Sequence, residues 1–247
     1  MANNNHLSNL TRLLRTEREH NSDSRRSDIY GYARSIAAVE KVIAVVSNLY
    51  ENTSRIFDGG FAAEIGLDGY DSENSIWEKR ILSLMPQSEL DNKLIAELRF
   101  YHFLRHRGKS RANYHLMTRL RFSDGKGGFR DILHRLYYIY GHEPTKPDYA
   151  ICLYGPLYVE FPGNSLAVNS ITGYAEELCA ESSADILSRR ELQVLRLIDS
   201  GLRSQEIAGQ LNISLHTVNR HRQNILAAMQ VKNSMEACRL ARSAGLL

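Results

Sequence analysis

The sequence predicts an α+β protein in which an antiparallel sheet with flanking helices precedes four helices that contain a helix-turn-helix. Three observations predict this fold class. Three aromatic-rich segments of strand length follow one another between residues 114 and 158, and a glycine-rich loop separates the first two. Residues 89–105 repeat apolar side chains at helical spacing. Beyond residue 187, four short segments with helical patterns are separated by residues typical of caps and turns.

A polar segment precedes the first helix and strands. Residues 1–28 are rich in Asn, Ser, Arg and Glu, with one weak apolar period, which predicts a mobile extension or a marginal amphipathic helix. A helical pattern at residues 33–39 leads into the β-branched run 42–46, which favours a buried strand. Residues 48–52 are expected to turn the chain back into a second strand at 54–57.

Helices and then strands are expected in the remainder of this region. Gly59 and Gly60 interrupt the second strand, and residues 77–85 and 89–105 have helical patterns. A hairpin loop at residues 123–128 joins the first two of the three aromatic-rich strands, which are expected at 114–122, 129–140 and 149–158.

The patterns divide the rest of the chain into three parts. Residues 29–162 are long enough for one complete domain with its own core. Residues 163–186 are looser and more acidic, which predicts a linker with a short strand pair of its own. Residues 187–247 form the helical domain, whose fourth helix is expected at about 234–244.

The helical domain begins with a capping box. Ser188 is followed three residues later by Glu191, so that a hydroxyl and a carboxylate satisfy the free amides at the start of a helix. The apolar stripe of this helix ends before Gly201, which suits a left-handed C-terminal cap. Ser204 is expected as the N-cap of a second, shorter helix.

A tight turn leads into the third helix. Asn212 tolerates the left-handed conformation of such a turn, and Ser214 is expected as the N-cap of a helix that continues to about Met229. The face opposite its apolar stripe has hydrogen-bonding or cationic side chains at helical spacing, namely His216, Asn219, Arg220 and Gln223. Side chains of this kind reach base edges, so the sequence predicts a helix-turn-helix that binds double-stranded DNA.

Nine residues are candidate DNA contacts. Arg220 and Arg222 are expected to contact nucleic acid because they lie within this motif. Ser204, Thr217 and Lys232 are expected to touch phosphate rather than bases, and a capping role alone would also explain Ser204. The full set is Ser204, Glu206, His216, Thr217, Asn219, Arg220, Arg222, Gln223 and Lys232.

Cationic charge is concentrated in the helical domain. Residues 187–247 contain nine Lys or Arg and four Asp or Glu, a balance of +5, whereas the whole chain has 31 and 28. Residues 1–186 therefore have 22 basic and 24 acidic side chains, a balance of −2. A basic patch attracts the phosphate backbone without reading sequence, so the charge distribution supports DNA binding.

The helical domain resembles the LuxR-type (GerE-like) DNA-binding domain. The matching positions are Leu187, Ser188, Arg190, Glu191, Val194, Leu195, Gly201, Glu206, Ile207, Ala208, Ile213, Ser214, Thr217, Val218 and His221. The resemblance implies that the third helix enters the major groove and that the fourth serves dimer contacts. The family usually has Lys where this chain has Asn219, and a basic residue is frequent at the position of Gln223. Because Asn and Gln favour adenine and Lys favours guanine, we expect an altered site preference.

Residues 41–158 resemble a PAS domain, a five-stranded sheet with helices along one side. The resemblance rests on the order of the elements and on the segments 100–104, 121–127 and 134–138. It implies a domain that encloses a small-molecule ligand or mediates dimerisation. A filled hydrophobic core without a ligand is the alternative, because fold does not dictate function.

The histidines and cysteines form no recognised motif. Three histidines among the aromatic strands are expected to be packed or surface groups, so no cofactor and no metal is assigned to His115, His134 or His142. His221, on the semi-buried side of its helix, is expected to make a structural hydrogen bond. The scattered cysteines suit packing roles in a reducing compartment; they are Cys152, Cys179 and Cys238.

The sequence therefore predicts a cytoplasmic, homodimeric transcriptional regulator, since no apolar stretch approaches the length of a membrane span. Double-stranded DNA and RNA polymerase are its expected partners. One alternative is an acyl-homoserine-lactone receptor of the same family, although the Trp-x-x-x-Tyr-Asp-Pro-x-Trp pattern of those receptors is absent. Another is a protein-interaction module that has lost DNA binding. An enzyme is not expected, because no nucleophile elbow, metal cluster or nucleotide loop is found.

Overall fold

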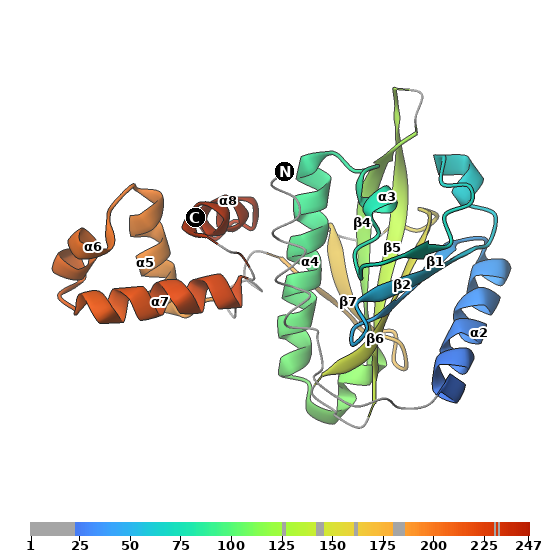
Figure 1. Ribbon diagram of the computed structural model, residues 1–247, viewed down its shortest axis with the longest axis horizontal. Coiled ribbons are helices and arrows are strands. Elements are labelled where there is room, and N and C mark those ends of the chain that lie inside the picture. The colour runs from blue at the N-terminus through green and yellow to red at the C-terminus, as the bar shows by residue number, and fades with distance from the viewer. Residues whose placement is uncertain are drawn as a thin grey trace.

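The computed structural model describes residues 23–124, 127–141, 146–160, 163–179, 186–229, 231 and 233–247, which form a sheet domain and a helical domain (Figure 1). The strands are β1 (Ile43–Asn48), β2 (Thr53–Asp58), β3 (Ser72–Glu73), β4 (Tyr114–Ser123), β5 (Phe129–Tyr140), β6 (Pro147–Pro156), β7 (Ser165–Asn169) and β8 (Ala175–Glu177). The helices are α2 (Asp23–Glu40), α3 (Lys79–Leu82), α4 (Gln87–Arg105), α5 (Arg189–Asp199), α6 (Ser204–Leu211), α7 (Leu215–Ala228) and α8 (Ser234–Ser243), with short 3-10 helices η1 (Ala62–Ile65) and η2 (Gly108–Asn113). The predicted α+β class is confirmed.

The strands form one antiparallel sheet in the order β3-β2-β1-β6-β5-β4-β7-β8. The five strands expected from the sequence are β1, β2, β4, β5 and β6, which lie side by side in it. The strand pair expected within residues 163–186 is also present, as β7 and β8. We expected this pair to stand in a linker, but β7 pairs with β4 and extends the sheet, because the edge of β4 offers unpaired backbone groups.

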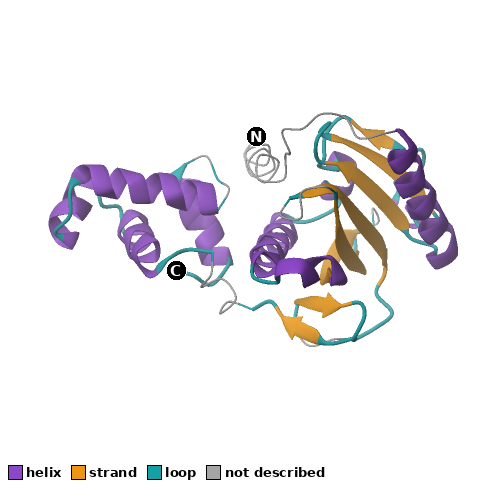
Figure 2. Cartoon of the chain, turned by 90° about the horizontal axis from the view of Figure 1, so that it is seen from below, coloured by secondary structure: helices purple, strands orange, loops and turns teal. Residues whose placement is uncertain are grey.

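Helices cover both faces of the sheet, as Figure 2 shows. Successive strand residues point to opposite faces. Ile43 and Val45 of β1 therefore belong to the larger core that α4 covers. Ala44 and Val46 belong to a second core that α2 closes with residues such as Ala33. The expectation of helices along one side is wrong for this reason.

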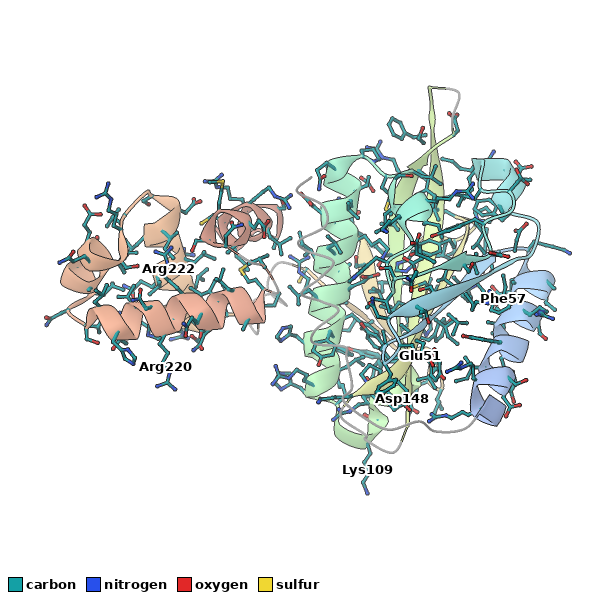
Figure 3. All side chains as sticks on the ribbon, viewed as in Figure 1. Glu51, Phe57, Lys109, Asp148, Arg220 and Arg222 are labelled. Atoms are coloured by element: carbon teal, nitrogen blue, oxygen red, sulfur yellow. The ribbon has the colours of Figure 1, made fainter. Side chains whose placement is uncertain are left out.

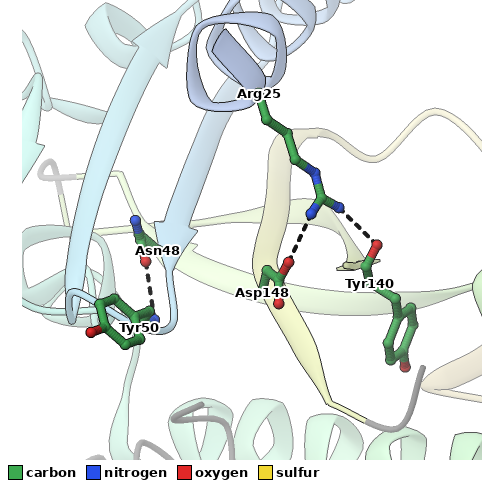
Figure 4. A network of polar contacts seen from close by, with 5 residues as sticks. All are labelled: Arg25, Asn48, Tyr50, Tyr140 and Asp148. Carbon is green, nitrogen blue, oxygen red and sulfur yellow. Dashed lines mark hydrogen bonds and ion pairs between the residues drawn. The ribbon is translucent and has the colours of Figure 1, made fainter. Parts of the chain in front are cut away.

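Helix α2 is anchored to the sheet at its first turns (Figure 4). Arg25 donates from Nη1 to Oδ2 of Asp148 over 2.9 Å and from Nη2 to the carbonyl oxygen of Tyr140 over 2.8 Å. The expected helix at residues 33–39 is consequently longer, and it includes residues 23–28 of the expected mobile extension. Residues 1–22 lie outside the described residues.

The helices between the second and fourth strands differ in how well they follow the sequence. Helix α4 is confirmed within two residues of its expected start. The expected helix at 77–85 is reduced to α3, although Trp77 and Ile81 are both buried. Among the described residues, no helix is both long and apolar enough to cross a membrane.

Helix α4 also contacts the helical domain. Figure 1 shows α4 between the strands and α8. Arg239 of α8 forms an ion pair with Asp91 of α4. Arg99 of α4 donates from Nη2 to the carbonyl oxygen of Ala244 over 2.6 Å and from Nη1 to that of Leu178 over 3.2 Å. One helix therefore touches both the interior of the sheet domain and the last helix of the chain.

Candidate nucleic-acid interface

The helical domain is built around a small apolar core. Val194 and Leu195 of α5, Ile207 of α6, and Val218 and Ile225 of α7 are all at most 1% exposed. These residues recur at helical spacing, so each helix buries one face against the others and leaves the opposite face to solvent. The geometry of the exposed faces is thus determined by this core.

The predicted first helix is confirmed at both ends. The Ser188 hydroxyl accepts from the Glu191 amide, and the Glu191 carboxylate accepts from the Ser188 amide over 2.9 Å. Gly201 adopts a φ of 88° at the other end, which favours glycine. At the second helix, however, Ser204 is the first helical residue and not the N-cap.

Arg203 is the N-cap of α6, and Glu206 completes this cap. The Glu206 carboxylate accepts a hydrogen bond of 2.6 Å from the Arg203 amide. A carboxylate in the first turn also interacts favourably with the helix dipole. The structure thus gives Glu206 a role in starting α6, and its contact with DNA stays a prediction.

The turn between α6 and α7 is confirmed in its two determining residues. Asn212 has a φ of 52°, the left-handed conformation expected of it. Ser214 is the N-cap of α7, because its hydroxyl accepts from the Thr217 amide over 3.0 Å. The Thr217 hydroxyl lies 2.8 Å from that of Ser214, so both side chains help to define where α7 begins.

The polar face of α7 is exposed, as the sequence predicts. This face, which we call the α7 polar face, consists of His216, Asn219, Arg220 and Gln223, and all four are exposed. Arg220 points away from the domain in Figure 3. It makes no ion pair with any of the described residues, so its guanidinium is available to an external group. DNA contact by these four residues stays a prediction.

Arg222 lies on another side of α7 and connects three helices. Its Nη1 donates to the Ser204 hydroxyl at the start of α6 over 3.0 Å, and its Nη2 donates to the Ser234 hydroxyl at the start of α8 over 2.9 Å. Figure 3 places Arg222 on the side of α7 away from Arg220. No local pattern predicts this bridge, because its partners are 18 and 12 residues away in the chain.

Two further arginines fix the arrangement of the helices. Arg190 of α5 donates over 3.0 Å to the carbonyl oxygen of Leu211, the last residue of α6. Arg242 of α8 holds Asp199 of α5 through Nη2 and Nε, over 2.5 and 3.3 Å. A guanidinium suits both tasks, because it presents several donors in a rigid fork.

Two residues singled out by the sequence remain to be placed, His221 and Lys232. The Nδ1 atom of His221 is buried without a hydrogen-bond partner among the described residues, so the structural hydrogen bond expected there is not found at this atom. Lys232 lies outside the described residues.

The sheet domain contains a group of buried ionisable side chains, which we call the buried polar cluster: Glu78, Lys93, Glu97, His134 and Cys152. Lys93 donates to Oε1 of Glu97 over 2.6 Å. Burial raises the pKa of Glu78 to about 7, against the opposing effect of Lys93. Burial and then Lys93 lower the pKa of His134 well below its ordinary value, so its imidazole is neutral.

Sequence reasoning missed this cluster. The available signal was Lys93 and Glu97, two charges four residues apart on the otherwise apolar face of residues 89–105. Of the histidines considered, His115 hydrogen-bonds to the Ser170 hydroxyl over 2.8 Å and stacks on an aromatic ring, as a packed group does. His142 lies outside the described residues. The missed buried polar cluster matters because ionisable groups with perturbed pKa values gather at functional sites.

Comparison with known proteins identifies the helical domain. Residues 185–241 match the family model for bacterial regulatory proteins of the luxR family. The oxygen regulatory protein NreC of Staphylococcus epidermidis is 32% identical over 96 residues, which are 38% of this chain and 44% of that protein. NreC of Staphylococcus aureus strain MRSA252 is 33% identical over 95 residues, with the same shares. The chain thus spans less than half the length of these curated relatives.

Two solved structures that cover most of this chain have low TM-scores against it. The phage VqmA-DPO complex gives a TM-score of 0.33 at 12% identity and covers 91% of this chain and 92% of that one. Escherichia coli SdiA gives a TM-score of 0.27 at 16% identity, with 97% of each chain covered. Scores this low do not establish a common fold over the whole chain.

Proposed function

We propose that this chain, whose residues 185–241 belong to the luxR family of bacterial regulatory proteins, is a transcriptional regulator that binds double-stranded DNA in a sequence-specific manner. The α7 polar face is the observation that carries the proposal. Helix α7 has 14 residues, so it is about 21 Å long and fits within a major groove. The curated relatives are named as regulatory proteins, which supports the regulatory part of the proposal.

We assign different kinds of DNA contact to different side chains of this domain. We assign base contacts to Asn219, Gln223 and Arg220, because amides pair with adenine and guanidinium groups with guanine. The hydroxyl of Thr217 and the α6 residue Ser204 lie beside the helix starts and are assigned to phosphate. Arg222 acts indirectly, because its two hydroxyl partners already occupy its guanidinium.

We further propose that the protein acts as a homodimer, with two α7 helices in successive major grooves about one helical turn apart. The sheet domain supports this with an apolar groove of about 430 Å³ between α2 and strands β5 and β6. Tyr32, which lines the groove together with Ile29 and Ile36, is 69% exposed, so the groove presents contiguous apolar surface to solvent. Burying this surface against a second copy would remove it from water.

The sheet domain is proposed to sense a signal. Burying ionisable groups costs free energy, and ionisable groups with perturbed pKa values gather at functional sites. The buried polar cluster places two acids, one lysine and one neutral histidine in the core. Helix α4 joins this cluster to α8, which offers a route from the sensed signal to the helical domain.

Titration with duplex DNA tests the function. Preferred sites are first selected from random duplexes with the full chain, and binding is then measured by fluorescence polarisation at several salt concentrations. Arg220→Ala should weaken specific binding by about 1 to 3 kcal/mol, roughly 5- to 150-fold. Lys109→Ala is the matched control, because it removes one exposed cation from η2 of the sheet domain, which Figure 3 shows pointing away from α7.

The proposal makes opposite predictions for these two variants. Lys109→Ala should bind the selected site as the parent chain does. Equal losses in both variants would mean that only net charge matters, and failure to enrich any sequence would contradict specific recognition.

A further inference from the structure

Three side chains from three different elements meet inside the sheet domain. Glu97 comes from α4, His134 from β5 and Cys152 from β6, and their donor atoms all lie within 4.8 Å of one another. The antiparallel register places Leu136 opposite Cys152 and His134 opposite Tyr154, so the histidine and the cysteine are diagonal neighbours on one face. All three are buried, with 4%, 0% and 6% of their surface exposed.

His134 is the residue that points to a ligand. Both of its ring nitrogens are buried without a hydrogen bond to any of the described residues. Its Nε2 lies 3.8 Å from Oε1 of Glu97, which is too long for a hydrogen bond. A neutral imidazole, which keeps a lone pair on one of its ring nitrogens, is the form in which histidine binds metal ions.

We propose that Glu97, His134 and Cys152 bind a divalent transition-metal ion of the zinc class. Nitrogen, sulfur and oxygen donors together suit such an ion, whereas calcium and magnesium require sites made of oxygen. The proposed binding site depends on this geometry alone. That the ion is the signal sensed by the sheet domain depends, in addition, on the function proposed above.

The distances suit a tetrahedral ion after a small adjustment. Ligand bonds of about 2.0 to 2.3 Å place the donors of a tetrahedral zinc site roughly 3.3 to 3.6 Å apart. The separation of 3.8 Å between His134 and Glu97 is close to this value. The widest separation, which is no more than 4.8 Å, must close by roughly 1 Å, which side-chain rotation at Glu97 or Cys152 supplies.

The size of the neighbouring cavity favours an ion over an organic molecule. A cavity of about 30 Å³ lies against Glu97 and Cys152, and Trp77 also lines it. Sites for organic ligands usually have about 300 to 1,000 Å³. This space accommodates one ion or one water molecule, so water is the competing occupant that the experiment must distinguish.

The charges of the cluster balance when the ion is present. Without a bound metal ion, burial and then Glu78 raise the pKa of the Cys152 thiol well above its ordinary value, against the opposing effect of Lys93. A divalent ion deprotonates a coordinating thiol, and the sulfur–metal bond forms as the thiol proton leaves to solvent. The ion and Lys93 then face three negative groups, the Cys152 thiolate and the carboxylates of Glu97 and Glu78. Metal binding should therefore release protons.

Cobalt substitution of the full chain tests the site. Protein freed of metal with a chelator is titrated with Co²⁺, and the thiolate-to-cobalt absorption band is recorded together with the metal content by mass spectrometry. One ion per chain and a thiolate band are expected. Cys152→Ser should abolish the band, and His134→Gln should weaken Co²⁺ binding by at least about 10-fold.

Matched controls come from residues outside the cluster. His115→Gln and Cys179→Ser should keep both the band and the stoichiometry, since His115 is held by Ser170 and Cys179 belongs to a different cavity. If Cys152→Ser does not fold, the double variant Cys179→Ser, Cys238→Ala still assigns the band, because Cys152 is then the only cysteine left.

The outcomes separate this inference from the proposed function. A parent chain that binds no Co²⁺ or Zn²⁺, or a band that persists in Cys152→Ser, overturns the metal site and leaves water as the occupant. DNA titration of the same samples reports on the function independently. A chain that binds DNA but binds no metal contradicts only this inference. A chain that binds metal but binds no DNA contradicts only the proposed function.

Discussion

Arg222 tests whether contacts within the helical domain or contacts with DNA determine the role of an arginine in α7. The structure predicts that Arg222→Ala destabilises the domain, because the two hydrogen bonds that connect α7 to α6 and α8 are lost together. A hydrogen bond from a charged donor contributes about 1.5 to 3 kcal/mol. The bonds are only partly buried and water can replace them, so we expect about 1 kcal/mol for each and about 2 kcal/mol in total.

Hydrogen exchange with mass spectrometry measures this loss locally. A decrease of about 2 kcal/mol in the free energy of opening should speed exchange in α6, α7 and α8 peptides about 30-fold. Arg220→Ala, which removes the same charge from the same helix, should leave these rates unchanged because Arg220 makes no ion pair within the described residues. If Arg222→Ala leaves the exchange rates unchanged and makes DNA affinity less dependent on salt, the bridge is refuted. Arg222 would then be assigned to a phosphate contact.

Three further predictions follow from the structure. Ser214→Ala removes the cap of α7 and should lower the stability of the helical domain by about 1 kcal/mol, seen as faster exchange in the first turn of α7; rates equal to the parent's would contradict the cap. Burial raises the pKa of Glu78 from 4.5 to about 7, so the unfolded chain loses this proton first and stability should fall by up to about 3 kcal/mol between about pH 4.5 and 7. Glu78→Gln should remove that dependence in urea unfolding followed by the single tryptophan, Trp77, and parallel pH profiles would rule it out. Arg239→Glu should break the ion pair with Asp91 and increase the radius of gyration in small-angle scattering, and Asp91→Arg in the same chain should restore it; a radius that does not respond to either change would show that this pair does not hold the domains together.

Local signals explain why the helical domain was predictable. Ser188 and Ser214 each cap a helix through an amide three residues further along the chain, and Gly201 and Asn212 each adopt the left-handed conformation at the end of a helix. All four have the predicted roles. The prediction that Ser204 is the N-cap of α6 was wrong. Arg203 occupies that position, and the Glu206 carboxylate accepts the hydrogen bond from its amide.

Long-range contacts explain what sequence reasoning missed. The length of α2 depends on Arg25, whose partners are 115 and 123 residues away. The pairing of β7 with β4 likewise joins segments that nothing local connects. The buried polar cluster has the same origin, since Lys93 and Glu97 become neighbours of His134 only after α4 packs on the sheet. Pattern and propensity do not include such contacts.

Helix α4 limits how the sheet domain can influence DNA binding. The α7 polar face is exposed while α8 rests on α4, so this contact does not act by covering the residues assigned to DNA. On one side of α4, Glu97 belongs to the buried polar cluster, and on the other side Asp91 and Arg99 hold α8. Asp91 and Arg99 are eight residues apart, about 12 Å along a helix that moves as a unit. The closure of roughly 1 Å needed for a tetrahedral ion therefore moves α8 where α4 shifts together with Glu97, and leaves α8 in place where the Glu97 side chain alone rotates. In a dimer a movement of α8 changes the spacing of two α7 helices, and half-site spacing determines whether both reach successive grooves.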